Sequence, residues 1–198
     1  MKETILAEIR RHRNLLDALE AQGFDTIEAT ARTLIDAVRS GGHIYLCGNG
    51  GSAADAQHVA GELMGRFRSD RPALPAVSLN SDSSVLTAVG NDYAFEDVFA
   101  RQVEALAREN DVLWAFSTSG ESPNVVKAVE AARRKGVKVI TFVGRSDSRL
   151  AMCGGACVMA DVCFCVDSPE TSTVQEMHQL AYHIVCNLVE RAMGEEKD

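Results

Sequence analysis

The sequence has few of the features that mark membrane, secreted or nucleic-acid-binding proteins. It contains no run of about 18 apolar residues, so no helix is expected to cross a membrane. Its net charge is −8 and no basic cluster is present, so neither DNA nor RNA is an expected ligand. The N-terminal segment alternates charged and apolar residues and lacks a signal-peptide core. We therefore expect a cytoplasmic protein with no membrane or nucleic-acid partner.

Several catalytic motifs are also missing. No Walker or GxGxxG fingerprint occurs, and the glycine-rich segment at residues 48–53 (GNGGSA) lacks the Lys-Ser/Thr pair of a P-loop. These absences disfavour hydrolysis of nucleoside triphosphates. No serine or cysteine nucleophile can be joined convincingly to a His/Asp pair.

Cysteine is present at six positions, but without the spacing of a zinc finger. The six are Cys47, Cys153, Cys157, Cys163, Cys165 and Cys186. We expect them to be reduced, buried thiols, as is usual inside cells. Cys163 and Cys165 stand two apart in a predicted strand, and we expect them to point to opposite faces of the sheet.

What the chain does contain is a regular alternation of strand and helix patterns, which predicts one α/β domain over residues 1–198. The predicted strands cover residues 43–47, 75–79, 111–117, 138–143 and 161–166. The predicted helices between and after them cover residues 52–64, 83–89, 96–108, 123–135 and 170–193. Five such strands favour a parallel sheet covered by helices on both faces, in three layers.

Two further helices precede this unit. Apolar spacing predicts the first from about residue 5 to Gly23 and the second over residues 27–38, opened by Asp25 or Thr26 as its cap. They are not needed to cover the sheet. We expect this pair, within residues 1–40, either to pack against another subunit or to lie on its own sheet.

Two loops rich in glycine and hydroxyl groups carry the strongest physical signal. GNGGS at residues 48–52 and FSTSGE at residues 116–121 each follow an apolar strand and open a helix. Backbone N–H groups and the helix dipole bind anions at such places. In a flavodoxin-like order, 2-1-3-4-5, the two loops would converge on one crevice at the switch point. The pair predicts a site for a phosphorylated small molecule.

Candidate catalytic side chains follow the first loop. His58 and Glu62 are spaced i, i+4 and share one helix face, roughly 6 Å apart. They suit a general base beside the substrate, two metal ligands, or an ordinary surface pair. Asn91 and Asp92 fit either a helix end or contacts to sugar hydroxyls.

The last predicted helix carries Gln175, Gln179 and His183 on one face at spacings of four. Its two histidines, His178 and His183, have apolar neighbours, which fits a core or interface residue as well as a catalyst. Two other histidines, His12 and His43, are expected to have no companions.

Four segments together resemble the phosphoheptose isomerases of the sugar isomerase (SIS) superfamily: residues 47–66, 88–99, 117–125 and 174–183. The resemblance implies a five-stranded SIS fold and a homotetramer with active sites near subunit interfaces. It also implies interconversion of sedoheptulose 7-phosphate and D-glycero-D-manno-heptose 7-phosphate, the first step toward the heptoses of lipopolysaccharide. The partner would be a phosphorylated seven-carbon sugar.

The resemblance also implies roles for single residues. Phosphate would be held by Ser117, Thr118, Ser119 and Ser122. The sugar would be held by Asn49, Gly50, Gly51, Glu62, Asn91, Asp92 and Gln175. Glu62 would be the general base and His183 its acid partner. Zinc, which members can carry, would lie at His58, Glu62, Gln175 and His183. Gln175 and His183 are roughly 12 Å apart along a straight helix, so both reach one ion only if their side chains lean together.

Two other readings compete with catalysis. Residues 71–92 also resemble non-catalytic SIS proteins that bind the bacterial replication initiator, but those differ at the positions of Glu62 and His183, which this chain keeps. A phosphosugar-sensing regulatory domain is disfavoured because no DNA-binding segment is seen. The chain departs from the isomerases at Gly61, where an acidic residue is common, and at residues 171–173, where some members place an aspartate.

Overall fold

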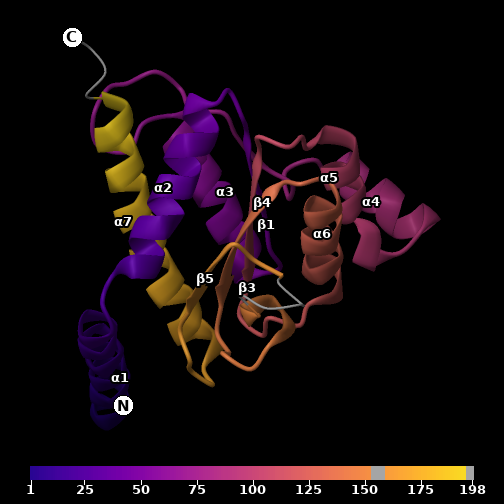
Figure 1. The fold of residues 1–198 in the computed structure, drawn as a ribbon. Helices are drawn as coiled ribbons and strands as arrows, with labels where there is room; N and C mark the ends of the chain where they lie inside the picture. The colour runs from indigo at the N-terminus through magenta and orange to yellow at the C-terminus, as the bar shows by residue number, and fades with distance from the viewer. Residues whose placement is uncertain (153–158, 195–198) are drawn as a thin grey trace.

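A computed structural model describes residues 1–152 and 159–194. Its centre is a sheet of five parallel strands in the order β2-β1-β3-β4-β5 (Figure 1). The strands are β1 (Ile44–Cys47), β2 (Ala76–Ser78), β3 (Val112–Ser117), β4 (Lys138–Val143) and β5 (Val162–Cys165). The predicted 2-1-3-4-5 order is confirmed, and it makes β1 and β3 neighbours.

Helices cover both faces of the sheet and complete three layers (Figure 1). One face carries α2 (Asp25–Arg39), α3 (Gly51–Met64) and α7 (Thr171–Gly194). The other carries α4 (Ser83–Asp92), α5 (Ala100–Leu106) and α6 (Pro123–Arg134). The expected α/β architecture is therefore the observed one.

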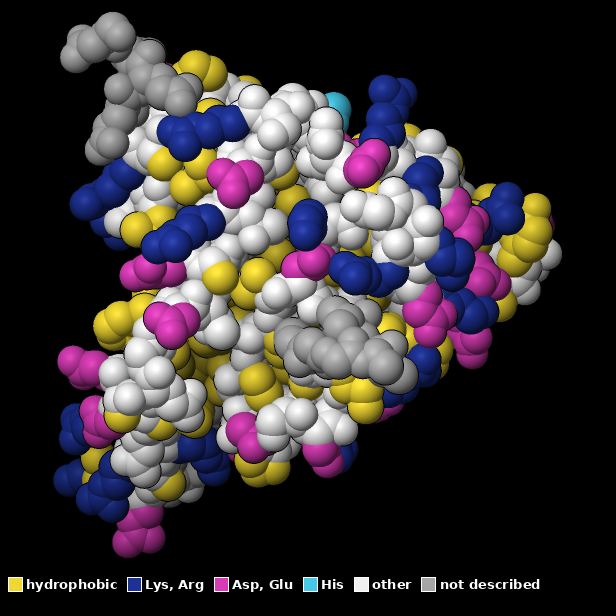
Figure 2. All heavy atoms as spheres, viewed as in Figure 1, with side chains coloured by type: hydrophobic (Ala, Val, Ile, Leu, Met, Phe, Trp, Pro, Cys, Tyr) yellow, Lys and Arg dark blue, Asp and Glu magenta, His cyan; other side chains and the backbone are white. Residues whose placement is uncertain are grey.

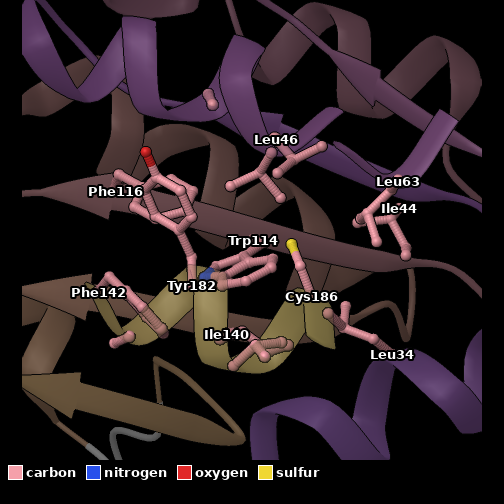
Figure 3. Close-up of a cluster of buried hydrophobic side chains, with 14 of the residues drawn as sticks. Leu34, Ile44, Leu46, Leu63, Trp114, Phe116, Ile140, Phe142, Tyr182 and Cys186 are labelled. Carbon is pink, nitrogen blue, oxygen red and sulfur yellow. The ribbon is translucent and has the colours of Figure 1, made fainter. Parts of the chain in front are cut away.

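The strands are apolar on both sides because each separates two cores. All six residues of β3 are buried, and they alternate between the cores. Trp114 and Phe116 face α7, where they meet Phe142 of β4 and Tyr182 (Figure 3). This aromatic packing fixes the position of α7 against the sheet, which matters for the site below.

The two leading helices differ in how they pack: one covers the sheet, contrary to the expectation, and the other does not. Helix α2 does cover the sheet: it packs on α7, and its Leu34 is fully buried in the first core. The idea that neither leading helix is needed was wrong for α2, because the face carrying α3 and α7 is wide enough to need a third helix. Helix α1 (Lys2–Gln22) has no buried residue and projects from the body (Figures 1 and 2).

Three local expectations were wrong. Helix α2 begins at Asp25 without a side-chain cap, so neither Asp25 nor Thr26 is its N-cap. The helix expected over residues 96–108 is interrupted: a 3-10 turn, η1 (Phe95–Asp97), precedes α5. Lys127 of α6 binds carboxylates in this turn, and such tertiary contacts override helix propensity. Helix α4 runs three residues beyond its expected end.

The cysteine expectations are only partly tested. Cys47 and Cys186 are buried free thiols, as expected, whereas Cys165 is a free thiol that is only partly buried. Cys163 and Cys165 pack against the same core, so the expectation of opposite faces was wrong, since residues two apart in a strand share a face. Cys153 and Cys157 lie outside the described residues. Among the described helices, none is long and apolar enough to cross a membrane.

Candidate active site

The loops after β1 and β3 meet at the carboxyl edge of the sheet. Asn49 of the first loop and Asn124, in the first turn of α6, exchange two side-chain amide hydrogen bonds of 2.8 and 2.9 Å. Asn124 is almost fully buried and also accepts a hydrogen bond from the backbone N–H of Val125. The predicted convergence of the two loops is confirmed, and Asn124 is a residue that sequence reasoning missed.

The first loop is fixed from two further sides. Asn80, just after β2, accepts a hydrogen bond from the Gly48 N–H and donates one to the Gly48 carbonyl. Gly50 has a φ of 56°, a conformation that favours glycine. A Cβ atom on Gly51 would lie 2.5 Å from Oε1 of Gln175, so this side chain of α7 rests directly on the loop. Three separate elements thus fix the backbone of this loop.

The second loop gathers its hydroxyl groups. Ser117 Oγ lies 3.2 Å from Ser122 Oγ and 3.4 Å from Ser119 Oγ. Backbone N–H groups of the same loop donate to the hydroxyls of Ser117 and Ser119. Three of the four predicted phosphate ligands are therefore in one cluster. The fourth, Thr118, lies beside them in sequence and faces the adjoining cavity.

That cavity has a volume of about 880 Å³ and opens beside the hydroxyl loop. Its lining includes Thr118, Ser119, Arg145, Asp147, Asp167 and Thr171. Among its described lining residues, Arg145 is the one cation, and its guanidinium binds both carboxylate oxygens of Asp147 at 3.0 and 2.9 Å. Arg145 was missed because it follows β4, which the sequence motifs did not include.

The second part of the site is a cluster of His58, Glu62 and His183 between α3 and α7. His58 Nε2 lies 3.0 Å from Glu62 Oε1 and 3.5 Å from His183 Nε2. One ligand atom from each residue lies within 4.8 Å of the others. Burial, followed by the charge of His58, lowers the pKa of His183, which favours a neutral imidazole.

Two imidazoles and a carboxylate are a donor set that zinc accepts, so these residues fit the metal implied by the resemblance. Gln175 lies elsewhere: it rests on Gly51 at the start of α3, eight residues before His183 in α7. Its role as a fourth ligand stays a prediction. On the described contacts, Gln175 belongs to the glycine loop.

A partly buried carboxylate and a buried phenol lie on the side of His58 opposite Glu62. Tyr182 is fully buried, and its hydroxyl lies 3.0 Å from His58 Nδ1 and 3.4 Å from Asp55 Oδ1. Burial raises the pKa of Asp55 to about 6, while the Tyr182 hydrogen bond and the His58 charge oppose the shift. Both residues were missed, although Asp55 stands one helical turn before His58 and Tyr182 stands next to His183.

The end of α3 that carries Glu62 is anchored by a buried ion pair. Arg71 donates to the backbone carbonyls of Glu62 and Leu63, in the last turn of α3, where carbonyls lack partners within the helix. Glu190 of α7 lies 3.6 Å from the Arg71 guanidinium and accepts hydrogen bonds from three backbone N–H groups after α3. Helices α3 and α7 are thus tied together close to the cluster.

Within one chain, Asn91 and Asp92 lie away from the loops and from the His58–Glu62–His183 cluster. Both are exposed at the end of α4, where Asn91 donates a 2.8 Å hydrogen bond to Asp92. Helix α4 belongs to the opposite face of the sheet from α3 and α7 (Figure 1). Their predicted contact with the sugar stays a prediction.

The remaining histidines are structural. His178 is fully buried, and its Nε2 lies 3.1 Å from the Val143 carbonyl, as expected for a core histidine. His12 has companions, contrary to expectation: its ring contacts the Glu176 carboxylate and the Glu8 carbonyl, which joins α1 to α7. His43 also has a neighbour, Asp111, at 3.6 Å.

Comparison with known proteins gives consistent results. The family model of the SIS domain matches residues 9–144. Phosphoheptose isomerase of Geobacter sp. (strain M21) is 44% identical over 193 residues, covering 98% of this chain and 97% of that protein. The protein of the same name from Roseiflexus sp. (strain RS-1) is 48% identical over 171 residues, covering 86% and 83%.

Solved structures agree with the sequence relatives. A phosphoheptose isomerase from Neisseria gonorrhoeae superposes with a TM-score of 0.87 at 37% identity, over 96% of this chain and 98% of that chain. A phosphoheptose isomerase from Francisella tularensis superposes with a TM-score of 0.88 at 32% identity, over 96% of this chain and 97% of that chain. The family-model match ends before His183, whereas these matches extend over most of the chain.

Proposed function

Because this chain belongs to the phosphoheptose isomerase family of SIS-domain proteins, we propose that it interconverts sedoheptulose 7-phosphate and D-glycero-D-manno-heptose 7-phosphate. The observation that carries the proposal is the cluster in which His58 contacts both Glu62, on the helix that starts at the glycine loop, and His183 of α7. Such an isomerisation moves one proton between two neighbouring carbons. It needs a base at the carbon and a group that stabilises negative charge on oxygen.

The hydroxyl loop binds the phosphate in this proposal. Ser117, Ser119 and Ser122 are held close together, and α6 begins directly after them, so its dipole favours an anion there. Arg145 supplies positive charge in the adjoining cavity. Phosphate binding at this end orients a substrate whose reacting carbons lie at its other end.

Glu62 takes the carbon-bound proton and returns it to the neighbouring carbon. His183 moves the proton of the substrate oxygen, for which a neutral imidazole with a lowered pKa is suited. Gln175 and Asn49, at the glycine loop, hold the sugar hydroxyls. Asn91 and Asp92 would act on the sugar from a neighbouring copy in a homotetramer.

A zinc ion would be held by His58, Glu62 and His183, with Gln175 as the proposed fourth ligand. When bound, it would supply a positive charge that stabilises the oxygen anion formed as the carbon proton leaves. We place the reaction in the cytoplasm, as the first step toward the heptoses of lipopolysaccharide.

The test is direct. Purified protein is incubated with sedoheptulose 7-phosphate, with and without a chelator, and heptose phosphate is followed by NMR. We expect turnover that the chelator lowers. Turnover that the chelator leaves unchanged would remove the metal from the proposal but keep the isomerase. No turnover in either condition would contradict the proposal and favour a non-catalytic SIS protein, such as one that binds the replication initiator.

A further inference from the structure

His58 is held from both sides of its ring. On one side, Nε2 faces Glu62 at 3.0 Å and His183 at 3.5 Å. On the other side, Nδ1 lies 3.0 Å from the hydroxyl of Tyr182. Figure 3 shows this hydroxyl oxygen at the rim of the aromatic cluster, pointing away from Trp114. The ring therefore links the catalytic cluster to the buried face of α7.

Counting protons leaves two arrangements of these groups. A neutral imidazole carries one N–H, and a phenol has one proton to donate. If Tyr182 donates to Asp55, its oxygen accepts the Nδ1–H of His58, and Nε2 presents a lone pair to Glu62 Oε1 at 3.0 Å, an arrangement that a cation bound to both atoms would stabilise. If Tyr182 donates to Nδ1 instead, the ring proton of His58 is on Nε2. It then points to Glu62, and Nε2 cannot bind a cation.

Asp55 favours the first arrangement. Its Oδ2 is buried and has no hydrogen-bond partner among the described residues, and the partner of its Oδ1 is Tyr182 at 3.4 Å. A carboxylate with a buried oxygen and no other donor is costly, so the proton of Tyr182 is drawn toward Asp55. The pKa of Asp55, raised by burial to about 6, still leaves it ionised at neutral pH.

We propose that Asp55 and Tyr182 are positioning residues that hold His58 as its Nδ1–H tautomer and thereby present Nε2 to a divalent cation. This inference rests on the proposed function, since it concerns the metal site assigned there. Groups that orient a ligating histidine in this way typically change metal affinity by about 10- to 100-fold when they are removed.

The first test measures zinc affinity of the metal-free protein by competition with a chromophoric chelator. Tyr182→Phe removes the hydroxyl but keeps the ring that packs on Phe116. We expect binding weaker by about 10- to 100-fold. Tyr45→Phe is the matched control, because it also removes a tyrosine hydroxyl, 3.4 Å from a backbone carbonyl, but in the other core. The control should bind zinc like the wild type.

Asp55 is tested with two variants. Asp55→Ala should weaken zinc binding as much as Tyr182→Phe, and the double variant should be no weaker than either, since both act through one hydrogen bond. Asp55→Asn keeps an acceptor for Tyr182 but not its charge, so it should restore part of the affinity. Full additivity of the two changes would contradict the proposal.

The second readout does not involve metal. Glu62 at 3.0 Å favours a proton on Nε2 of metal-free His58, and the Tyr182–Asp55 pair opposes it, so nitrogen-15 NMR of the histidine rings should show a larger share of the Nδ1–H tautomer in the metal-free wild type than in Tyr182→Phe. An unchanged tautomer, or zinc affinity within twofold of wild type, would overturn the proposal. If the wild type binds no zinc but the tautomer shifts as stated, only the metal in the proposed function fails.

Discussion

Asn49 and Asn124 each donate a side-chain amide hydrogen bond to the carbonyl oxygen of the other, at 2.8 and 2.9 Å. One residue follows β1 and the other begins α6, so the pair joins the glycine loop to the end of the hydroxyl loop. Each amide pairs its oxygen and one N–H in this contact, and Asn124 is almost fully buried. We infer that the two loops hold their relative position before any substrate arrives.

Replacing Asn124 tests this link. In Asn124→Ala the amide of Asn49 loses its partner and the Val125 N–H loses an acceptor. We expect the free energy of unfolding to fall by about 1–3 kcal/mol, measured by denaturant titration. The KM for the sugar phosphate should rise as well. Asn110→Ala, at an exposed position before β3, is the control and should change neither quantity.

Two glycines of α3 should respond in opposite ways to alanine. In Gly51→Ala the new methyl group would lie 2.5 Å from Gln175, so loop or side chain must move and activity should fall at least tenfold. Gly61 has open space around its Cβ position in the same helix. Gly61→Ala should therefore stabilise the protein by about 0.5–1 kcal/mol with normal activity. Steady-state kinetics measure the activity of the two variants, and denaturant titration measures their stability. Equal activities of Gly51→Ala and Gly61→Ala would contradict the contact between Gln175 and the loop.

Arg145 should control binding of the phosphate. Arg145→Gln removes the cation of the cavity and leaves Asp147 as an unpaired negative charge, so KM should rise by about five- to tenfold. Asp147→Asn releases the guanidinium and should lower KM. Arg32→Gln, at an exposed ion pair on α2, serves as the control. Equal KM values for all four proteins would exclude Arg145 from the site.

Glu62 is expected to be the base. Glu62→Gln keeps the shape of the side chain but cannot take up a proton, so kcat should fall by about 100- to 10,000-fold. Binding of the substrate, measured by calorimetry, should stay within about tenfold. Glu28→Gln, an exposed carboxylate on α2, should behave as the wild type. Near-normal turnover of Glu62→Gln would rule out this role.

His178 should make stability depend on pH. Burial lowers its pKa from 6.5 to about 4 in the folded protein. As pH falls from 6.5 toward 4, the unfolded chain takes up a proton that the folded protein does not, so stability is lost, by roughly 3 kcal/mol.

The variant His178→Gln can keep a hydrogen bond to the Val143 carbonyl but does not titrate. The difference in unfolding free energy between wild type and variant should be constant above pH 7. Below pH 6.5, the wild type should lose stability relative to the variant. Parallel curves from pH 4 to 8 would show that His178 is not the group responsible.

The strands, the two loops and the pair of His58 and Glu62 could be predicted because each depends on residues close together in sequence. The strand order pairs distant segments, such as β1 with β3, and was predicted only by assuming a flavodoxin-like arrangement. Strand and helix periods, glycine at turns and i, i+4 spacing are local properties. The same reasoning failed for α2 and for residues 95–106, where contacts with distant segments decide the structure. It also gave His12 no companion, since Glu176 is 164 positions away.

The sequence by itself determined the parallel sheet, the anion loops at its carboxyl edge and the residue types of the cluster. Only the tertiary structure decided that His183 meets His58, that Gln175 rests on Gly51, and that Tyr182 stands between His58 and Asp55. These contacts depend on how α7 lies against α3, which the aromatic core of the sheet fixes. Side-chain packing between distant segments sets that placement, and no local pattern in either helix contains it.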